Sequence, residues 1–295
     1  MKSSSYSLYF VLFSLIALLL FSLVPIYQIL SYDSDRMYNL RAVPAKYRSS
    51  LLEYFLDISH KEGAVLFLGD SQVYGHMQPT QYVFSTLLGN KLNKTVINAA
   101  FQDAGILDNI YALEYAITKN MEFDVVVFNA NPSHVRYPNH KRLDLDNPAD
   151  FRFGLLKNSQ VFHEFPNKFS PQEVHDGGFA KYYEKPGHFD MPDRGFYIYL
   201  TRLNKLIGLA KSISKDVIIY MTPHDGADTI RLELNMSNYD KLSEAADEVC
   251  KDNEVVCLNP DISAREHYFD LIHFSEKGHT AMADILLDVI RRGVI

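Results

Sequence analysis

The sequence has no excess of positive charge. Its 295 residues include 29 Lys and Arg against 36 Asp and Glu, which gives a formal net charge of -7. Proteins that bind nucleic acids need clustered basic side chains to displace the counterions of the phosphates. We therefore expect no nucleic-acid partner. The hydrophobic share of 47% is that of an ordinary globular protein, and the chain is long enough for one large domain.

Cysteine is also scarce. The chain has two cysteines, Cys250 and Cys257, within the segment "EVCKDNEVVC". No second Cys or His pair has the spacing of a zinc site, so we expect no metal centre. The two cysteines flank a predicted turn between a helix and a strand, where a disulfide is sterically possible and would suit an extracytoplasmic compartment. Two reduced, buried cysteines would fit the same positions equally well.

Charge is absent from residues 3–32, and residues 9–30 read "YFVLFSLIALLLFSLVPIYQIL". A helix of this length spans roughly 30 Å, the thickness of a bilayer core. The run is long for a signal peptide, and no small-residue cleavage site follows it. We predict an uncleaved transmembrane signal anchor over residues 1–32. A juxtamembrane connection over residues 33–62, with a short amphipathic helix near 50–58, then leads to the main domain.

The charges around this segment give conflicting indications of its orientation. Lys2 precedes it, whereas Arg36, Arg41, Lys46 and Arg48 follow it. A count of positive charges alone would place the body of the protein in the cytoplasm. The very short N-terminal tail favours the opposite orientation, because long domains are translocated largely regardless of charge. We expect the main domain to be extracytoplasmic.

Residues 63–295 alternate between apolar strand-like runs and helix-like segments. The runs lie at 64–68, 95–98, 124–129, 216–221 and 254–258, and the helical segments near 80–92, 105–118, 196–213, 239–250 and 276–292. Strands that are apolar throughout and alternate with helices predict a mostly parallel sheet covered on both faces. The fold class is therefore α/β, a three-layer α/β/α sandwich. Residues 132–195 lack this rhythm and form an irregular insertion, which we expect to be a lid or substrate platform.

Two short segments carry the candidate chemistry. The run "VLFLGDSQVYG" places Ser71 at the carboxyl end of the first strand, and "YFDLIHFSEKGHTAMADIL" places Asp270 three residues before His273. A serine needs a neighbouring base, and that base needs a carboxylate on its other nitrogen. We predict that Ser71, His273 and Asp270 form a catalytic triad. This chemistry requires no cofactor.

Other histidines and carboxylates compete for roles around this site. His279, with Glu276 three residues before it, is a rival base. His76 follows Ser71 closely, and His224 and Asp225 in "MTPHDG" follow the fourth strand, so these three are candidates for substrate contact, or else are ordinary loop and turn residues. Surface positions are expected for the histidines at the start of and within the insertion, which are His134, His140, His163, His175 and His188.

Three blocks together resemble the SGNH, or GDSL-like, hydrolase superfamily. They are "GDSQ", the Asn-containing "VVVFNANPSH" and "DLIH", and the resemblance spans about residues 64–290. It implies a flavodoxin-like sandwich in which Ser71 is the nucleophile and its N–H lines the oxyanion hole. The side-chain amide of Asn131 would donate to the same oxyanion, with Asn129 as its rival.

Two blocks depart from the family pattern. The third block usually reads Gly-x-Asn-Asp, whereas residues 129–132 read Asn-Ala-Asn-Pro. The second block usually offers a glycine soon after an asparagine, whereas Asn98 is followed by Ala99 and Ala100. Since only a backbone donor is required, the N–H of Ala100 is the third expected member of the oxyanion hole.

The anchor and the proline in the third block resemble one branch of this superfamily, the membrane-anchored proteins of cell-envelope acylation. These act in teichoic-acid D-alanylation and in O-acetylation of exopolysaccharides such as alginate or cellulose. The resemblance implies an O-acyltransferase that passes an acetyl or D-alanyl group through an acyl-serine to a cell-surface polymer, beside a multi-spanning membrane-bound O-acyltransferase. The alternatives are an esterase or deacetylase of the same fold and a catalytically silent scaffold subunit.

Overall fold

The computed structural model describes residues 37–39, 48–75, 78–101, 104–136, 193–227 and 236–293. The predicted anchor over residues 1–32 and nearly all of the insertion lie outside these ranges. Within them, no helix combines the length and the apolar character that a membrane crossing requires.

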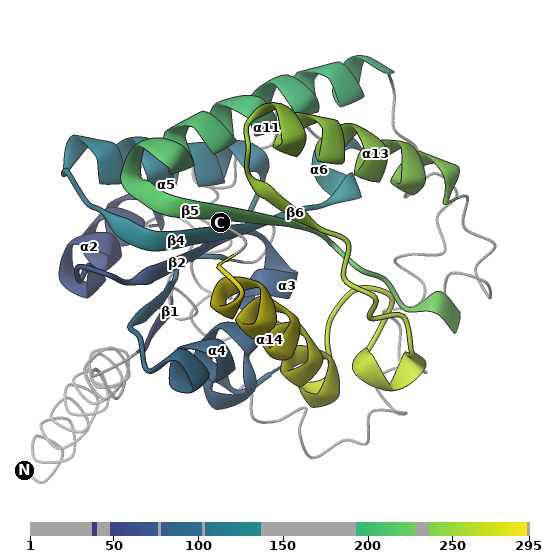
Figure 1. Cartoon of the computed structure of the whole chain (residues 1–295), viewed down its shortest axis with the longest axis horizontal. Coiled ribbons are helices and arrows are strands. Elements are labelled where there is room, and N and C mark those ends of the chain that lie inside the picture. The colour runs from purple at the N-terminus through teal and green to yellow at the C-terminus, as the bar shows by residue number, and fades with distance from the viewer. Residues whose placement is uncertain are drawn as a thin grey trace, which may run out of the picture. The chain divides into compact units, whose positions relative to one another are not determined.

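A six-stranded parallel sheet forms the centre of the domain (Figure 1), with the strand order β1-β3-β2-β4-β5-β6. The strands are β1 (Met37–Asn39), β2 (Val65–Leu68), β3 (Val96–Asn98), β4 (Phe123–Ala130), β5 (Ser214–Met221) and β6 (Val256–Leu258). The predicted parallel sheet is confirmed. Strand β1 was not predicted, and it pairs with β3 from within the segment interpreted as a juxtamembrane connection.

Helices cover both faces of this sheet, which confirms the three-layer sandwich (Figure 1). Along β2, Leu66 and Leu68 belong to one core cluster, and Val65 and Phe67 belong to the other, as the alternation of a strand requires. The first cluster packs against α2 (Arg48–Ser59), α5 (Ile106–Thr118), α11 (Asp193–Ile213) and α13 (Ser237–Asp252), and the second against α4 (Phe84–Leu92) and α14 (Glu276–Arg291).

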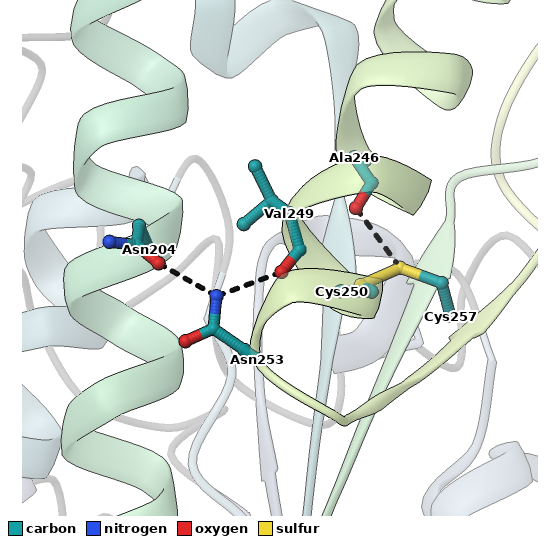
Figure 2. The surroundings of a disulfide bond; sticks show 6 residues. All are labelled: Asn204, Ala246, Val249, Cys250, Asn253 and Cys257. Atoms are coloured by element: carbon teal, nitrogen blue, oxygen red, sulfur yellow. Dashed lines mark hydrogen bonds between the residues drawn. A yellow bond between two sulfur atoms is a disulfide. The ribbon is translucent and has the colours of Figure 1, made fainter.

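The two cysteines form a disulfide that joins the end of α13 to strand β6 (Figure 2). Of the two interpretations of this pair, the structure has the oxidised one. Beside it, the side-chain amide of Asn253 donates to Asn204 Oδ1 at 2.7 Å and to Val249 O at 2.8 Å. The bond to Asn204, which lies on α11, holds the end of α13 against that helix.

The topology gathers strand ends at one edge of the sheet. From β2 the chain continues to β3 on one side, and from β4 it continues to β5 on the other side. In parallel α/β sheets, reacting groups collect outside the carboxyl ends of strands at such a change of direction. The segments after β2 and β4 contain Ser71 and Asn131, so the predicted site residues lie where the fold favours a site.

Candidate active site

Ser71 is the first residue of the short helix α3 (Ser71–Tyr74), directly after β2. Asp70 caps this helix, because its Oδ1 accepts a hydrogen bond of 2.9 Å from the Gln72 N–H. Gly69 makes the turn possible: its φ is 147°, and a Cβ there would collide with Val73 and Asn129. The turn leaves Ser71 partly exposed while its neighbours are buried.

The structure brings the three predicted triad residues into one hydrogen-bonded chain. His273 Nε2 lies 2.9 Å from Ser71 Oγ, and His273 Nδ1 lies 2.7 Å from Asp270 Oδ2. A carboxylate only accepts, so the proton of the neutral imidazole lies on Nδ1 and points to Asp270. Nε2 is then the acceptor for the Ser71 hydroxyl. This is the arrangement in which a histidine can take a proton from a serine nucleophile.

Asp270 also shapes the turn that presents His273. Its Oδ1 accepts hydrogen bonds from the N–H groups of Ile272 at 3.0 Å and of His273 at 2.8 Å. Burial by itself would raise the pKa of this carboxyl, but the charge and hydrogen bonds of His273 and the Ile272 N–H outweigh it. The pKa of Asp270 therefore lies well below its ordinary value. Asp270 stays ionised at neutral pH and can stabilise a protonated His273.

The two asparagines of the third block have different surroundings. Asn129 uses both amide hydrogens inside the protein, donating to Asp70 Oδ2 at 3.0 Å and to Thr222 Oγ1 at 2.9 Å. A primary amide has no third hydrogen to offer an oxyanion. Asn131 also donates to Asp70 Oδ2, at 2.5 Å, and follows the end of β4 directly. Between the two, Asn131 is the candidate for the oxyanion hole.

The N–H of Ala100, which was predicted to line the oxyanion hole, is engaged within its own turn in this structure. Its N–H donates to Asn98 Oδ1 at 3.2 Å, and the residue is fully buried. Asn98 is itself held in place, since its amide donates to Val73 O and Ser85 Oγ, each at 2.9 Å. The side chain of Asn98 thus folds back over its own turn and takes the donor that the oxyanion was expected to use. Ser71 N–H and the Asn131 amide remain as candidate donors.

The residues proposed for substrate contact do not all reach the site. Asp225 is fully buried, with Oδ1 accepting from Ala227 N–H at 2.9 Å and its carboxylate paired with Arg265, so it cannot touch a substrate. His224 is also buried, with its ring edge-on to Tyr239 at 5.0 Å. Both belong to the packing at the end of β5. His76 lies outside the described residues.

The rival base His279 serves a structural purpose. It is 1% exposed, its ring stacks on Phe84 at 5.6 Å, and its Nδ1 accepts the Phe84 N–H at 3.2 Å. That N–H belongs to the first turn of α4, where the helix itself provides no acceptor. A nitrogen engaged in this way is not available to Ser71. His279 is therefore excluded as the base.

His134 is buried rather than on the surface, which corrects the prediction for this histidine. It lies on α6 (Pro132–Arg136), donates from Nε2 to Ala104 O at 2.9 Å, and has the same nitrogen 3.6 Å from Asp70 Oδ2. The other four histidines of the insertion lie outside the described residues. Within the described part of the chain, no group of His, Cys, Asp and Glu side chains is arranged to hold a metal ion.

Sequence reasoning missed the buried polar residues behind the triad, Asp70 and Gln72. Asp70 is 4% exposed and Gln72 is 1% exposed. The available signal was a charged and an amide residue flanking Ser71 in a segment that is otherwise apolar. Such residues have to find hydrogen-bond partners when they are buried.

No protein-family model matches the sequence, and no curated protein matches it. Among solved structures, one described as an SGNH hydrolase from Slackia heliotrinireducens is 16% identical, with a TM-score of 0.47 over 78% of this chain and 100% of that one. A member of the lipolytic G-D-S-L family from Veillonella parvula is 14% identical, with a TM-score of 0.48 and coverages of 79% and 100%. A catalytic mutant of the acetylxylan esterase Axe2 from Geobacillus stearothermophilus is 13% identical, with a TM-score of 0.46 and coverages of 77% and 93%.

These structural neighbours are SGNH and GDSL hydrolases. With TM-scores of 0.46 to 0.48, the likeness carries no information on the activity or substrate of this chain. The function is inferred instead from the hydrogen-bonded chain of Ser71, His273 and Asp270.

Proposed function

We propose that this protein cleaves acyl esters through an acyl-serine formed on Ser71. One observation carries the proposal: Ser71 Oγ, the His273 ring and the Asp270 carboxylate are joined by hydrogen bonds of 2.9 Å and 2.7 Å. Each residue has the partner that its role requires, a base for the serine and a carboxylate for the base. The buried, ionised Asp270 adds the electrostatic support that a protonated imidazole needs.

The reaction follows from this geometry. As Ser71 Oγ bonds to the ester carbonyl carbon, its proton moves to His273 Nε2, and Asp270 stabilises the imidazolium. The oxyanion accepts hydrogen bonds from Ser71 N–H and the Asn131 amide. His273 then returns the proton to the departing alkoxide, which leaves the acyl group on Ser71. In the second half, His273 takes a proton from water or from an acceptor hydroxyl, whose oxygen attacks the carbonyl carbon of the acyl-serine. His273 then returns that proton to Ser71 Oγ as the bond between Ser71 and the acyl group breaks, which frees the serine and leaves the acyl group on water or on the acceptor.

We further propose that the acceptor is a hydroxyl of a cell-surface polymer, outside the membrane and beside a membrane-bound O-acyltransferase. The apolar, uncharged residues 9–30 support a tethered enzyme, and the motif resemblance supports acetyl or D-alanyl as the group transferred. The Cys250–Cys257 disulfide also supports an extracytoplasmic domain, because disulfides persist mainly in oxidising compartments.

The test is turnover of 4-nitrophenyl acetate by the full-length protein in detergent, with and without an acetyl-accepting oligosaccharide. We expect Ser71-dependent release of nitrophenol and an acetylated oligosaccharide. Ser71→Ala should abolish both, whereas Ser212→Ala, which changes an exposed serine on α11, should leave both unchanged. Hydrolysis that no acceptor alters would support the esterase, and a folded protein without turnover would support the scaffold.

A further inference from the structure

Gln72, the residue after Ser71, is almost fully buried and joins three segments of the site. Its side-chain amide nitrogen donates to Ile272 O at 2.7 Å and to Pro223 O at 3.3 Å. Ile272 directly precedes His273, and Pro223 lies in the segment that follows β5. One side chain therefore connects the nucleophile turn, the end of β5 and the loop of His273.

The loop that carries His273 is held through its backbone on both sides. Asp270 accepts the N–H groups of Ile272 and His273, as described above. On the carbonyl side, Leu271 O accepts the Asp225 N–H at 2.9 Å, and Ile272 O accepts Gln72 Nε2. Of these contacts, the one from Gln72 is made by the residue next to the nucleophile Ser71. It fixes the position of the His273 loop relative to Ser71 rather than within the loop itself.

The orientation of the Gln72 amide follows from its partners. A carbonyl oxygen can only accept, so the atom that faces Ile272 O and Pro223 O has to be the nitrogen. The amide oxygen has no hydrogen-bond partner among the described residues. A buried oxygen without a partner is unfavourable. The side chain is thus kept in this place for its two donations, which no apolar residue could make.

We propose that Gln72 is a positioning residue that sets the Ser71–His273 distance, an inference that rests on the proposed acyl-serine chemistry. Its amide donates to the main-chain carbonyls of Ile272 and Pro223. It acts by fastening the carbonyl next to His273 to the residue next to Ser71. A displacement of about 1 Å between a nucleophile and its base can cost about 10²-fold in rate.

The first test compares Gln72→Met with Asn253→Ala in the full-length protein. Methionine has a similar length and no donor. Asn253 is the matched control, because its amide also donates to two acceptors, yet it lies between α11 and α13 beside the disulfide (Figure 2). The measurement is the rate constant for phosphonylation of Ser71 by a fluorophosphonate, which an inactive unfolded fraction does not change. We expect a loss of about 10- to 100-fold for Gln72→Met and less than about twofold for Asn253→Ala.

The second test separates positioning from a general structural effect. With 4-nitrophenyl acetate, Gln72→Met should lower kcat and leave KM nearly unchanged, because Gln72 is not proposed to contact the substrate. In an Asp270→Asn background the base is already misoriented, so Gln72→Met should cost less than about threefold further. Losses that simply multiply would overturn the inference. If Gln72→Met does not fold, Gln72→Asn replaces it, since it keeps the donors but is too short to reach both carbonyls.

The outcomes distinguish this inference from the proposed function. If the wild-type protein forms no Ser71 adduct, the proposed function fails and the inference fails with it. If the wild type reacts and Gln72→Met reacts equally fast, only the role of Gln72 is overturned.

Discussion

Two turns of this protein contain the same kind of hydrogen bond, but the bond has opposite consequences for the site. After β2, Asp70 Oδ1 accepts a hydrogen bond from the N–H of Gln72, two residues further along the chain. At the end of β3, Asn98 Oδ1 accepts a hydrogen bond from the N–H of Ala100, again two residues further along. In the first turn the bond starts helix α3 and leaves Ser71 partly exposed. In the second it consumes the donor that an oxyanion hole would need. The same local motif therefore positions the nucleophile at the end of β2 and occupies a possible oxyanion donor at the end of β3.

Asp270 forms a third turn of this kind. Its carboxylate accepts two backbone N–H groups through Oδ1 and holds the His273 ring through Oδ2. The largest expected effect comes from Asp270→Asn, which retains an oxygen to accept the N–H groups of Ile272 and His273 but removes the carboxylate from His273 Nδ1. We expect kcat to fall by about 10⁴, because the imidazole then adopts the wrong tautomer. The unfolding free energy at neutral pH should also fall, because the interactions of the ionised carboxylate with His273 are lost, but the variant should remain folded. A near-normal kcat would refute the triad.

The two asparagines at the end of β4, Asn129 and Asn131, are expected to differ in their effects on catalysis and on stability. Asn131→Ala should lower kcat by about 10²- to 10³-fold, the usual cost of losing one oxyanion donor. Asn129→Ala removes bonds to Asp70 and Thr222 instead, so it should lower the unfolding free energy by about 1–3 kcal/mol and kcat by less than about tenfold. Denaturant titration and steady-state kinetics on both variants check this, and the reverse pattern would assign the role to Asn129.

The turn after β3 is predicted to be structural. Asn98→Ala removes bonds to Val73 and Ser85 and releases the Ala100 N–H. We expect the unfolding free energy to fall by about 1–3 kcal/mol, with kcat within about threefold of wild type. A loss of kcat above about 10²-fold in the folded variant would return Ala100 and its turn to the catalytic machinery.

The smallest expected effect concerns pH. The folded pKa of Asp270 lies below its ordinary value of 3.8, so its interactions stabilise the protein fully above about pH 4 and are lost progressively as the pH falls below it. The unfolding free energy of wild type should therefore decrease on acidification below that pH. Asp270→Asn should show a shallower decrease in the same denaturant titrations. Identical slopes in the two proteins would mean that this carboxyl is not perturbed.

Some parts of the molecule could be predicted from the sequence and others could not. The parallel sheet and the triad could be predicted from the sequence, because apolar runs mark buried strands and Asp270 lies only three residues before His273. Strand β1 could not, since Met37–Asn39 is short and lies in a polar segment, and only pairing with β3 makes it a strand.

Side-chain direction was the other missing information. Nothing in the letters "INAAF" indicates that Asn98 turns back to Ala100, nor that the ring of His279 faces the start of α4. The burial of His134 beside Asp70 likewise depends on contacts between segments far apart in the chain. The positions of candidate residues at the strand ends could be predicted. The hydrogen-bond partner of each side chain depends on tertiary packing and could not.

The role of Ser71 as the nucleophile and of His273 as its base is tested most directly by the site of phosphonylation in the full-length protein at neutral pH. After reaction with a fluorophosphonate, intact-mass analysis and peptide mapping should show one adduct for each chain, on Ser71. His273→Ala should form the same adduct far more slowly, since the serine then lacks its base. A folded protein that carries no adduct on Ser71, or an adduct whose rate of formation is independent of His273, would contradict these two roles.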